Sequence, residues 1–116
     1  LVRVSTLRSE GVDPMAIRLV LLAHHYRGEW EWTAQDLTQA QERLKRWRRG
    51  LSTDGGPDAT GTIAQIRAAV ADDLDTPAAL RAVDTWVEQP LATTGDVRSA
   101  PGELARAIDA LLGIRL

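Results

Sequence analysis

The sequence contains no cysteine and no phenylalanine, and it has no long run of hydrophobic residues. Without cysteine the chain can form no disulfide and offers no thiolate to a metal, which is compatible with a cytoplasmic protein. The longest apolar run, residues 19–23, is far shorter than the roughly 20 residues that span a membrane. The formal net charge is only -2, so any contact with nucleic acid or anionic lipid would need a local patch. We therefore expect a cytoplasmic protein with no membrane partner.

The residues that are present suit one small domain. The 116 residues are 44% hydrophobic, and Ala, Leu and Val accompany four Trp. A chain of this length buries about two-thirds of the surface that its unfolded form exposes. Small aliphatic side chains favour closely packed helices. Residue 1 is Leu rather than Met, and we expect the chain to be part of something longer.

Helical signals dominate the first half of the chain. Residues 5–10 could form a short helical turn that ends at Gly11. Asp13 and Pro14 are typical of an N-cap and a first helical position, and the apolar residues that follow to residue 23 predict a helix buried on most sides. A capping signal at Thr33 predicts a second helix from residue 34. Its apolar residues share one stripe: Leu37, Ala40, Leu44, Trp47 and Leu51.

The second half alternates loops with helices. Turn-forming residues predict an exposed, mobile loop over residues 50–61 and another loop over residues 89–100. Thr76 and Pro77 predict the N-cap and first position of a helix, and Gly113 closes the last helix. The buried positions of these helices should include Ile63, Ile66, Val70, Leu80, Val83, Val87, Leu104, Ile108, Leu111 and Leu112. The prediction is an all-α fold, a small bundle of four to five helices plus the N-terminal turn, as a single domain over residues 1–116.

Two clusters of polar residues could suggest a metal site, but the spacing of their residues does not support one. His24 and His25 are adjacent, and neighbouring helical side chains point about 100° apart, so the pair cannot easily converge on one metal ion. We interpret them as a helix-end pair that satisfies local carbonyls and the helix dipole. Asp72, Asp73 and Asp75 lack the spacing of a calcium loop. Their carboxylates instead stabilise the start of the next helix, by about 0.3–1 kcal/mol each at the surface.

A third cluster is basic. Five cations lie within seven residues near the end of the second helix: Arg43, Lys45, Arg46, Arg48 and Arg49. They could contact phosphate. The preferred interpretation is that they complement the helix dipole, with Glu42 and Arg46 as an ion pair one turn apart, because cations on all sides of a helix form no single stripe.

Trp30 and Trp32 alternate with acidic residues, which predicts an extended segment with both indoles on one face. Packing is the preferred role and base stacking the alternative. The chain has no glycine-rich phosphate loop and no plausible set of nucleophile and base. We predict no catalytic, cofactor-binding or metal-binding residue in it.

One stretch is too distinctive for a generic helix. Residues 12–32 read VDPMAIRLVLLAHHYRGEWEW, residues 1–7 read LVRVSTL, and residues 72–80 read DDLDTPAAL. These segments resemble the cysteinyl-tRNA synthetases and the related cysteine:glucosaminyl-inositol ligases of mycothiol biosynthesis, in the part that follows the KMSKS-type ATP loop. The resemblance implies the C-terminal helical domain of a larger class I synthetase-like enzyme, with its catalytic domain upstream.

The compact ending after residue 106 and the Trp30-Glu31-Trp32 run look like the ligase. The resemblance then implies an enzyme that activates cysteine with ATP and passes the cysteinyl group to glucosaminyl-inositol, with Zn²⁺ on the cysteine thiolate. ATP and Zn²⁺ would bind the upstream part, and this segment alone should catalyse nothing. The alternative is a tRNA-contacting helical domain of a synthetase.

Overall fold

A computed structural model describes residues 11–24, 34–53, 55–72, 75–89 and 97–116. Within them the chain forms five α-helices and no strand, which confirms the all-α prediction. The helices are α2 (Pro14–Leu22), α3 (Ala34–Leu51), α4 (Thr60–Ala71), α5 (Thr76–Glu88) and α6 (Ala100–Leu112). The turn predicted at residues 5–10 lies outside the described residues.

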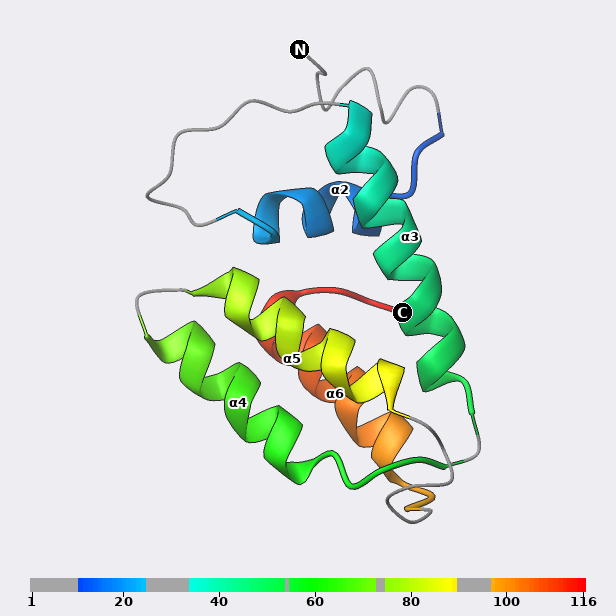
Figure 1. The fold of residues 1–116 in the computed structure, drawn as a ribbon, viewed down its shortest axis with the longest axis vertical. Helices are drawn as coiled ribbons and strands as arrows, with labels where there is room; N and C mark the ends of the chain where they lie inside the picture. Colours follow the sequence, from blue (N-terminus) through cyan, green and yellow to red (C-terminus); the bar gives the residue numbers. More distant parts are fainter. Residues whose placement is uncertain (1–10, 25–33, 54, 73–74, 90–96) are drawn as a thin grey trace.

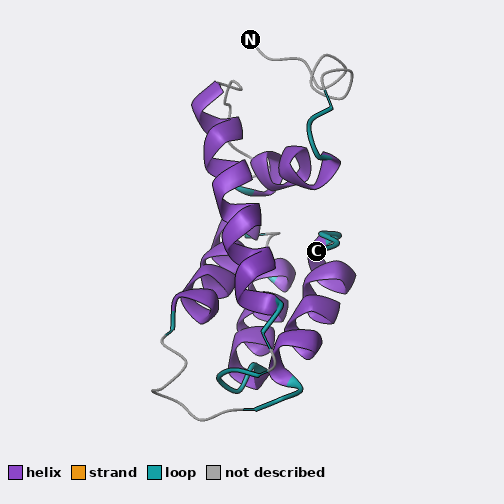
Figure 2. Ribbon diagram, turned by 90° about the vertical axis from the view of Figure 1, so that its right-hand side faces the viewer, coloured by secondary structure: helices purple, strands orange, loops and turns teal. Residues whose placement is uncertain are grey.

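The helices form two levels in Figure 1. α4, α5 and α6 pack together at the bottom, α3 runs along one side of the whole molecule, and α2 crosses α3 near its upper half. Figure 2, turned by 90°, shows that α2 projects to one side of α3. α2 is therefore the helix least enclosed by the others.

The two predicted start signals, Asp13-Pro14 and Thr76-Pro77, do begin helices, with one shift of the cap. Asp13 caps α2, because its Oδ1 accepts a hydrogen bond from the Met15 backbone N–H at 2.9 Å. At α5 the N-cap is Asp75, whose Oδ1 accepts from the Ala78 N–H at 3.3 Å. The prediction of Thr76 as the cap is wrong by one residue, since the Asp75 carboxylate takes that role.

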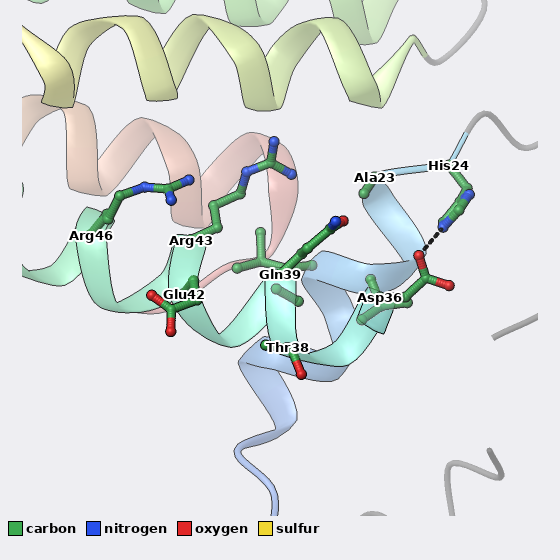
Figure 3. A pocket seen from close by; sticks show the side chains of 11 residues that line it. Ala23, His24, Asp36, Thr38, Gln39, Glu42, Arg43 and Arg46 are labelled. Atoms are coloured by element: carbon green, nitrogen blue, oxygen red, sulfur yellow. Dashed lines mark ion pairs between the residues drawn. The ribbon is translucent and has the colours of Figure 1, made fainter. Parts of the chain in front are cut away.

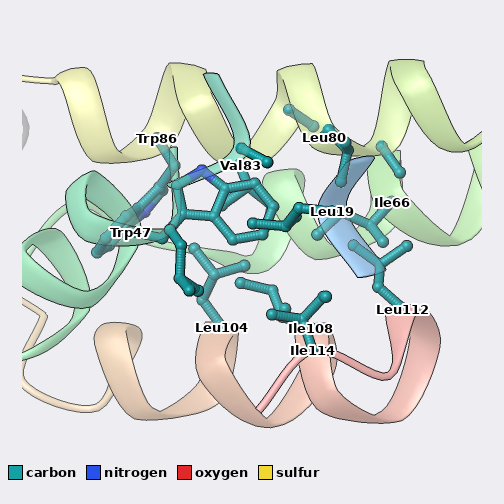
Figure 4. Packing of buried hydrophobic residues seen from close by; sticks show 14 of the residues in the cluster. Leu19, Trp47, Ile66, Leu80, Val83, Trp86, Leu104, Ile108, Leu112 and Ile114 are labelled. Carbon is teal, nitrogen blue, oxygen red and sulfur yellow. The ribbon is translucent and has the colours of Figure 1, made fainter. Parts of the chain in front are cut away.

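The core lies where α3, α4, α5 and α6 converge, and one face of α2 contributes Ala16, Leu19 and Val20 to it (Figure 4). Its largest fully buried side chains are Trp47, Leu19, Ile66, Leu80, Leu104, Ile108, Leu112, Ile114, Val20 and Val83. Each such apolar side chain contributes on the order of 1.5–3 kcal/mol. The predicted stripe of α3 is confirmed: Ala40, Leu44 and Trp47 are buried, while Leu37 and Leu51 are half-buried at its ends.

The helix at residues 14–22 is not buried on most sides, contrary to the prediction. Ala16, Ile17, Leu19 and Val20 are buried, but the Leu21 side chain is 48% exposed and Arg18 is exposed. Among the described helices, α2 packs mainly against α3 and touches α5. Its outer face is left open among the described residues.

The segment between α3 and α4 is not simply an exposed loop. Gly55, Gly56, Pro57 and Ala59 are buried. Gly56 pairs with Val97 through backbone hydrogen bonds of 2.8 and 3.2 Å. The cause is packing against α5: a Cβ at Gly56 would lie 3.0 Å from the Trp86 ring, so glycine permits the close approach.

Candidate functional site

A cleft of about 450 Å³ lies between the end of α2 and one side of α3 (Figure 3). Its apolar wall consists of Leu19, Val20, Ala23 and Ala40. The polar side chains that line it are His24, Asp36, Thr38, Gln39, Glu42, Arg43 and Arg46. Polar residues thus outnumber apolar ones in the lining of this cleft.

His24 faces Asp36 at one end of this cleft. The His24 Nε2 and the Asp36 Oδ1 are 3.7 Å apart, and both side chains are about one-quarter exposed. The partner is a carboxylate on α3, which the sequence did not predict. His25 lies outside the described residues. In the described part of the chain, no group of three or more His, Cys, Asp or Glu residues could hold a metal ion.

Two cations of the basic cluster of α3 pair with carboxylates on neighbouring elements. The Arg43 guanidinium donates twice to Asp84 on α5, from Nε to Oδ1 at 3.2 Å and from Nη2 to Oδ2 at 2.9 Å. Arg48 Nη2 donates to the Asp13 Oδ2 at 2.8 Å. Lys45, Arg46 and Arg49 are exposed, and the expected ion pair of Glu42 with Arg46 is not among those of the described residues. The five cations form no single phosphate-binding stripe.

Asp84 is a contact that sequence reasoning missed. Besides Arg43, it accepts a hydrogen bond from the Trp47 indole Nε1–H at 2.8 Å. One carboxylate, 17% exposed, therefore ties two side chains of α3 to α5. The available signal was an acidic residue directly after the buried Val83, at the edge of an apolar seam. A charge in that position needs a partner.

The acidic residues around residue 75 have separate roles. Asp75 caps α5, which confirms the helix-start interpretation for this residue. Asp72 follows the last turn of α4, where its backbone N–H bonds to Ala68, and it is exposed. Asp73 lies outside the described residues, as do Trp30 and Trp32.

Asp13 combines two interactions at the start of α2. The backbone hydrogen bond from Met15 lowers the pKa of the Asp13 carboxyl, partial burial opposes this, and the Arg48 guanidinium lowers the pKa further. The ionised form is thus the one that both caps α2 and joins it to α3.

The described polar contacts mainly connect helices. Thr76 Oγ1 donates to the Leu22 carbonyl oxygen at 2.7 Å, and Arg18 Nε donates to the Leu112 carbonyl oxygen at 2.7 Å. No described helix has the length and apolar character to cross a lipid bilayer. The two side-chain bonds tie α2 to α5 and to the end of α6.

Comparison with known proteins gives a consistent result along the whole chain. No family model matches it. Over its full length it is 60% identical to an L-cysteine:1D-myo-inositol 2-amino-2-deoxy-alpha-D-glucopyranoside ligase of Sanguibacter keddieii. It is 55% identical to the ligase of the same name from Streptomyces griseus and 53% identical to that of Thermobifida fusca. The chain spans about 28% of the length of these relatives.

Proposed function

We infer the function from one premise: this chain belongs to the L-cysteine:1D-myo-inositol 2-amino-2-deoxy-alpha-D-glucopyranoside ligase family. We propose that it is the C-terminal helical part of an enzyme that joins cysteine to glucosaminyl-inositol in mycothiol biosynthesis. The whole enzyme activates cysteine with ATP, releasing pyrophosphate and forming cysteinyl-adenylate. The amine of glucosaminyl-inositol then attacks the activated carbonyl and releases AMP.

The observation that carries this proposal is an identity of 53–60% to three such ligases over the full length of the chain. The tRNA-contacting alternative is not favoured. Its best support was the basic cluster of α3, and there Arg43 and Arg48 are engaged by Asp84 and Asp13. Phosphate binding would have to compete with both carboxylates.

The chemistry belongs to the rest of the enzyme in this proposal. Zinc sites in proteins use Cys, His and carboxylate ligands, usually three or four of them. The described residues contain no such group and the sequence contains no cysteine, so they do not fit Zn²⁺. We assign Zn²⁺, ATP and both substrates to residues outside this chain. A reaction that consumes ATP also implies a cytoplasmic enzyme.

The role left to this chain is mechanical support of the upstream catalytic domain. α2 anchors four buried apolar residues against the bundle and leaves its other face open. A helix fixed in this way can hold an attached segment, including the ATP-binding loop, in a defined position.

The test compares the full-length enzyme with its upstream domain lacking this segment. Two quantities are measured, cysteine-dependent exchange of pyrophosphate into ATP and formation of cysteinyl-glucosaminyl-inositol. We expect the truncated enzyme to lose most of both activities. Adding the isolated chain in trans is the control and should restore them. Undiminished activity and stability without the segment would contradict the supporting role.

A further inference from the structure

α2 is held from two directions. On one side it packs against α3, to which Asp13 and Arg48 also tie it. On the other side it meets the residues that follow α6. Figure 1 shows this last segment running between α2 and α5. Residues far apart in sequence thus meet beneath α2.

The second attachment centres on Arg18. Its Nε–H donates to the Leu112 carbonyl oxygen at 2.7 Å across 94 residues of sequence. This carbonyl belongs to the last turn of α6, where backbone oxygens lack partners within the helix and the dipole favours a cation. A charged donor at this distance makes one of the stronger classes of hydrogen bond.

Gly113 makes room for this contact. It adopts a left-handed conformation with φ +68° and closes α6. A Cβ at this position would lie 2.6 Å from Nη2 of Arg18 and 2.7 Å from its Nε. The backbone angle favours glycine at this position, and a Cβ there would also displace the guanidinium that lies over it.

Two further contacts extend the attachment. Ile114 is fully buried in the core, so the segment after α6 is itself anchored. The Arg115 backbone N–H points to the Met15 Sδ at 3.2 Å. Met15 and Arg18 are three residues apart and therefore share one face of α2. That face rests on residues 112–115.

We propose that Arg18 is a positioning residue for the ligation reaction: by joining α2 to the end of α6, it fixes the helix that supports the catalytic part of the enzyme. This inference rests on the proposed function. Most of the length of the relatives lies outside this chain, and α2 offers it an open face on which Leu21 is 48% exposed. Loosening α2 at Arg18 therefore changes the geometry of a distant active site without touching a substrate.

The test uses the full-length enzyme and three variants, numbered as in this chain. Arg18→Met keeps the apolar stem and removes the donor, while Arg18→Lys keeps a charged donor. Arg67→Met is the matched control, because Arg67 is an exposed arginine on α4 and has no side-chain hydrogen bond or ion pair among those of the described residues. Hydrogen exchange of the α2 amides is measured beside kcat and KM for ATP.

We expect Arg18→Met to speed exchange in α2 by about tenfold, the factor that corresponds to loss of one charge-assisted hydrogen bond, while α5 stays protected. KM for ATP should rise severalfold or kcat should fall by a similar factor. Arg18→Lys should restore part of both changes, and Arg67→Met should alter neither.

Two results would overturn the inference. Exchange in α2 that stays at the wild-type rate in Arg18→Met would show that the contact does not hold the helix. Faster exchange in α2 with unchanged kinetics would show that the position of α2 does not matter to the reaction. A wild-type enzyme without ligation activity would instead contradict the proposed function, and exchange would still decide whether Arg18 holds α2.

Discussion

α2 and α5 begin with the same local chemistry and end in different surroundings. Both have an Asp N-cap and a Pro within the first two helical positions. α5 lies inside the bundle with five buried residues, and α2 lies across its margin with an open outer face (Figure 1). Both helices have polar contacts to other elements, but α5 is enclosed by apolar packing, whereas α2 has fewer buried residues to which its polar contacts add.

This difference shows that the residues that start a helix are not those that determine its position in the fold. The start depends on residues within one turn of the cap. The placement of α2 depends on its buried residues and also on Arg18 with Leu112 and Thr76 with Leu22, contacts that span 94 and 54 residues. A helix placed by a few polar contacts is also easier to shift than one enclosed by a core.

Removing an apolar side chain should reveal the largest difference in stability between α5 and α2. Leu80 of α5 is fully buried, so Leu80→Ala should lower the free energy of unfolding by about 3 kcal/mol through lost burial and a residual cavity. Leu21→Ala on the open face of α2 should change it by less than about 0.5 kcal/mol. Urea denaturation of both variants measures this. Similar losses at the two positions would mean that α2 is as enclosed as α5.

Next in size is the carboxylate that joins α3 to α5. Asp84→Ala should cost about 2 kcal/mol, because it leaves the Trp47 indole N–H and the Arg43 guanidinium without their acceptor in a largely buried position. Asp84→Asn keeps an oxygen for Trp47 and should cost about half as much. If urea denaturation shows equal losses of unfolding free energy for the two variants, the oxygen kept by Asp84→Asn does not contribute as expected.

A smaller effect is expected at the polar link from α5 to α2. Thr76→Val removes the hydroxyl that donates to the Leu22 carbonyl oxygen and should cost about 1 kcal/mol. Exchange of the α2 amides should quicken while α4 remains protected. Thr85→Val is the control, since that hydroxyl bonds within its own helix at an exposed position. An equal response of α2 to both variants would argue against the link.

The smallest effect concerns pH. The pKa of Asp13 is lowered in the folded chain, so its ionised form stabilises the fold above the unfolded pKa of about 3.9. That stability is lost as the pH falls through the folded pKa. Asp13→Asn keeps an N-cap and loses the charge, and solvent limits the change at neutral pH to about 0.5 kcal/mol. Unfolding curves from pH 7 to pH 3 should therefore converge at the acid end for the variant and wild type. A gap that widens toward acid would contradict this sign.

The sequence predicted the helices and their apolar stripes because both depend on short-range periodicity. The stripe of α3 and the Gly113 stop of α6 are examples. It placed the α5 cap one residue late, since Thr76 and Asp75 are both good caps and only the structure shows which side chain accepts the bond. The burial of Gly56 was missed because it depends on Trp86, which is distant in sequence.

The polar contacts of the candidate functional residues were likewise predictable only in part. The basic cluster of α3 was rightly not read as one stripe, but its partners Asp84 and Asp13 lie on other helices and could not be predicted from spacing. In the sequence, Arg18 is a charged residue that interrupts the apolar run of α2, and nothing nearby shows its partner. Its contact with Leu112 gives that interruption a physical reason.

The most direct test of the central claim gives the full-length enzyme a choice of acceptors. Purified enzyme receives ATP, cysteine and equal concentrations of glucosaminyl-inositol and cysteine-accepting tRNA, and both products are quantified over time. The account predicts ATP-dependent formation of cysteinyl-glucosaminyl-inositol with no cysteinyl-tRNA above background. Accumulation of cysteinyl-tRNA, with the amino sugar left unchanged, would contradict it.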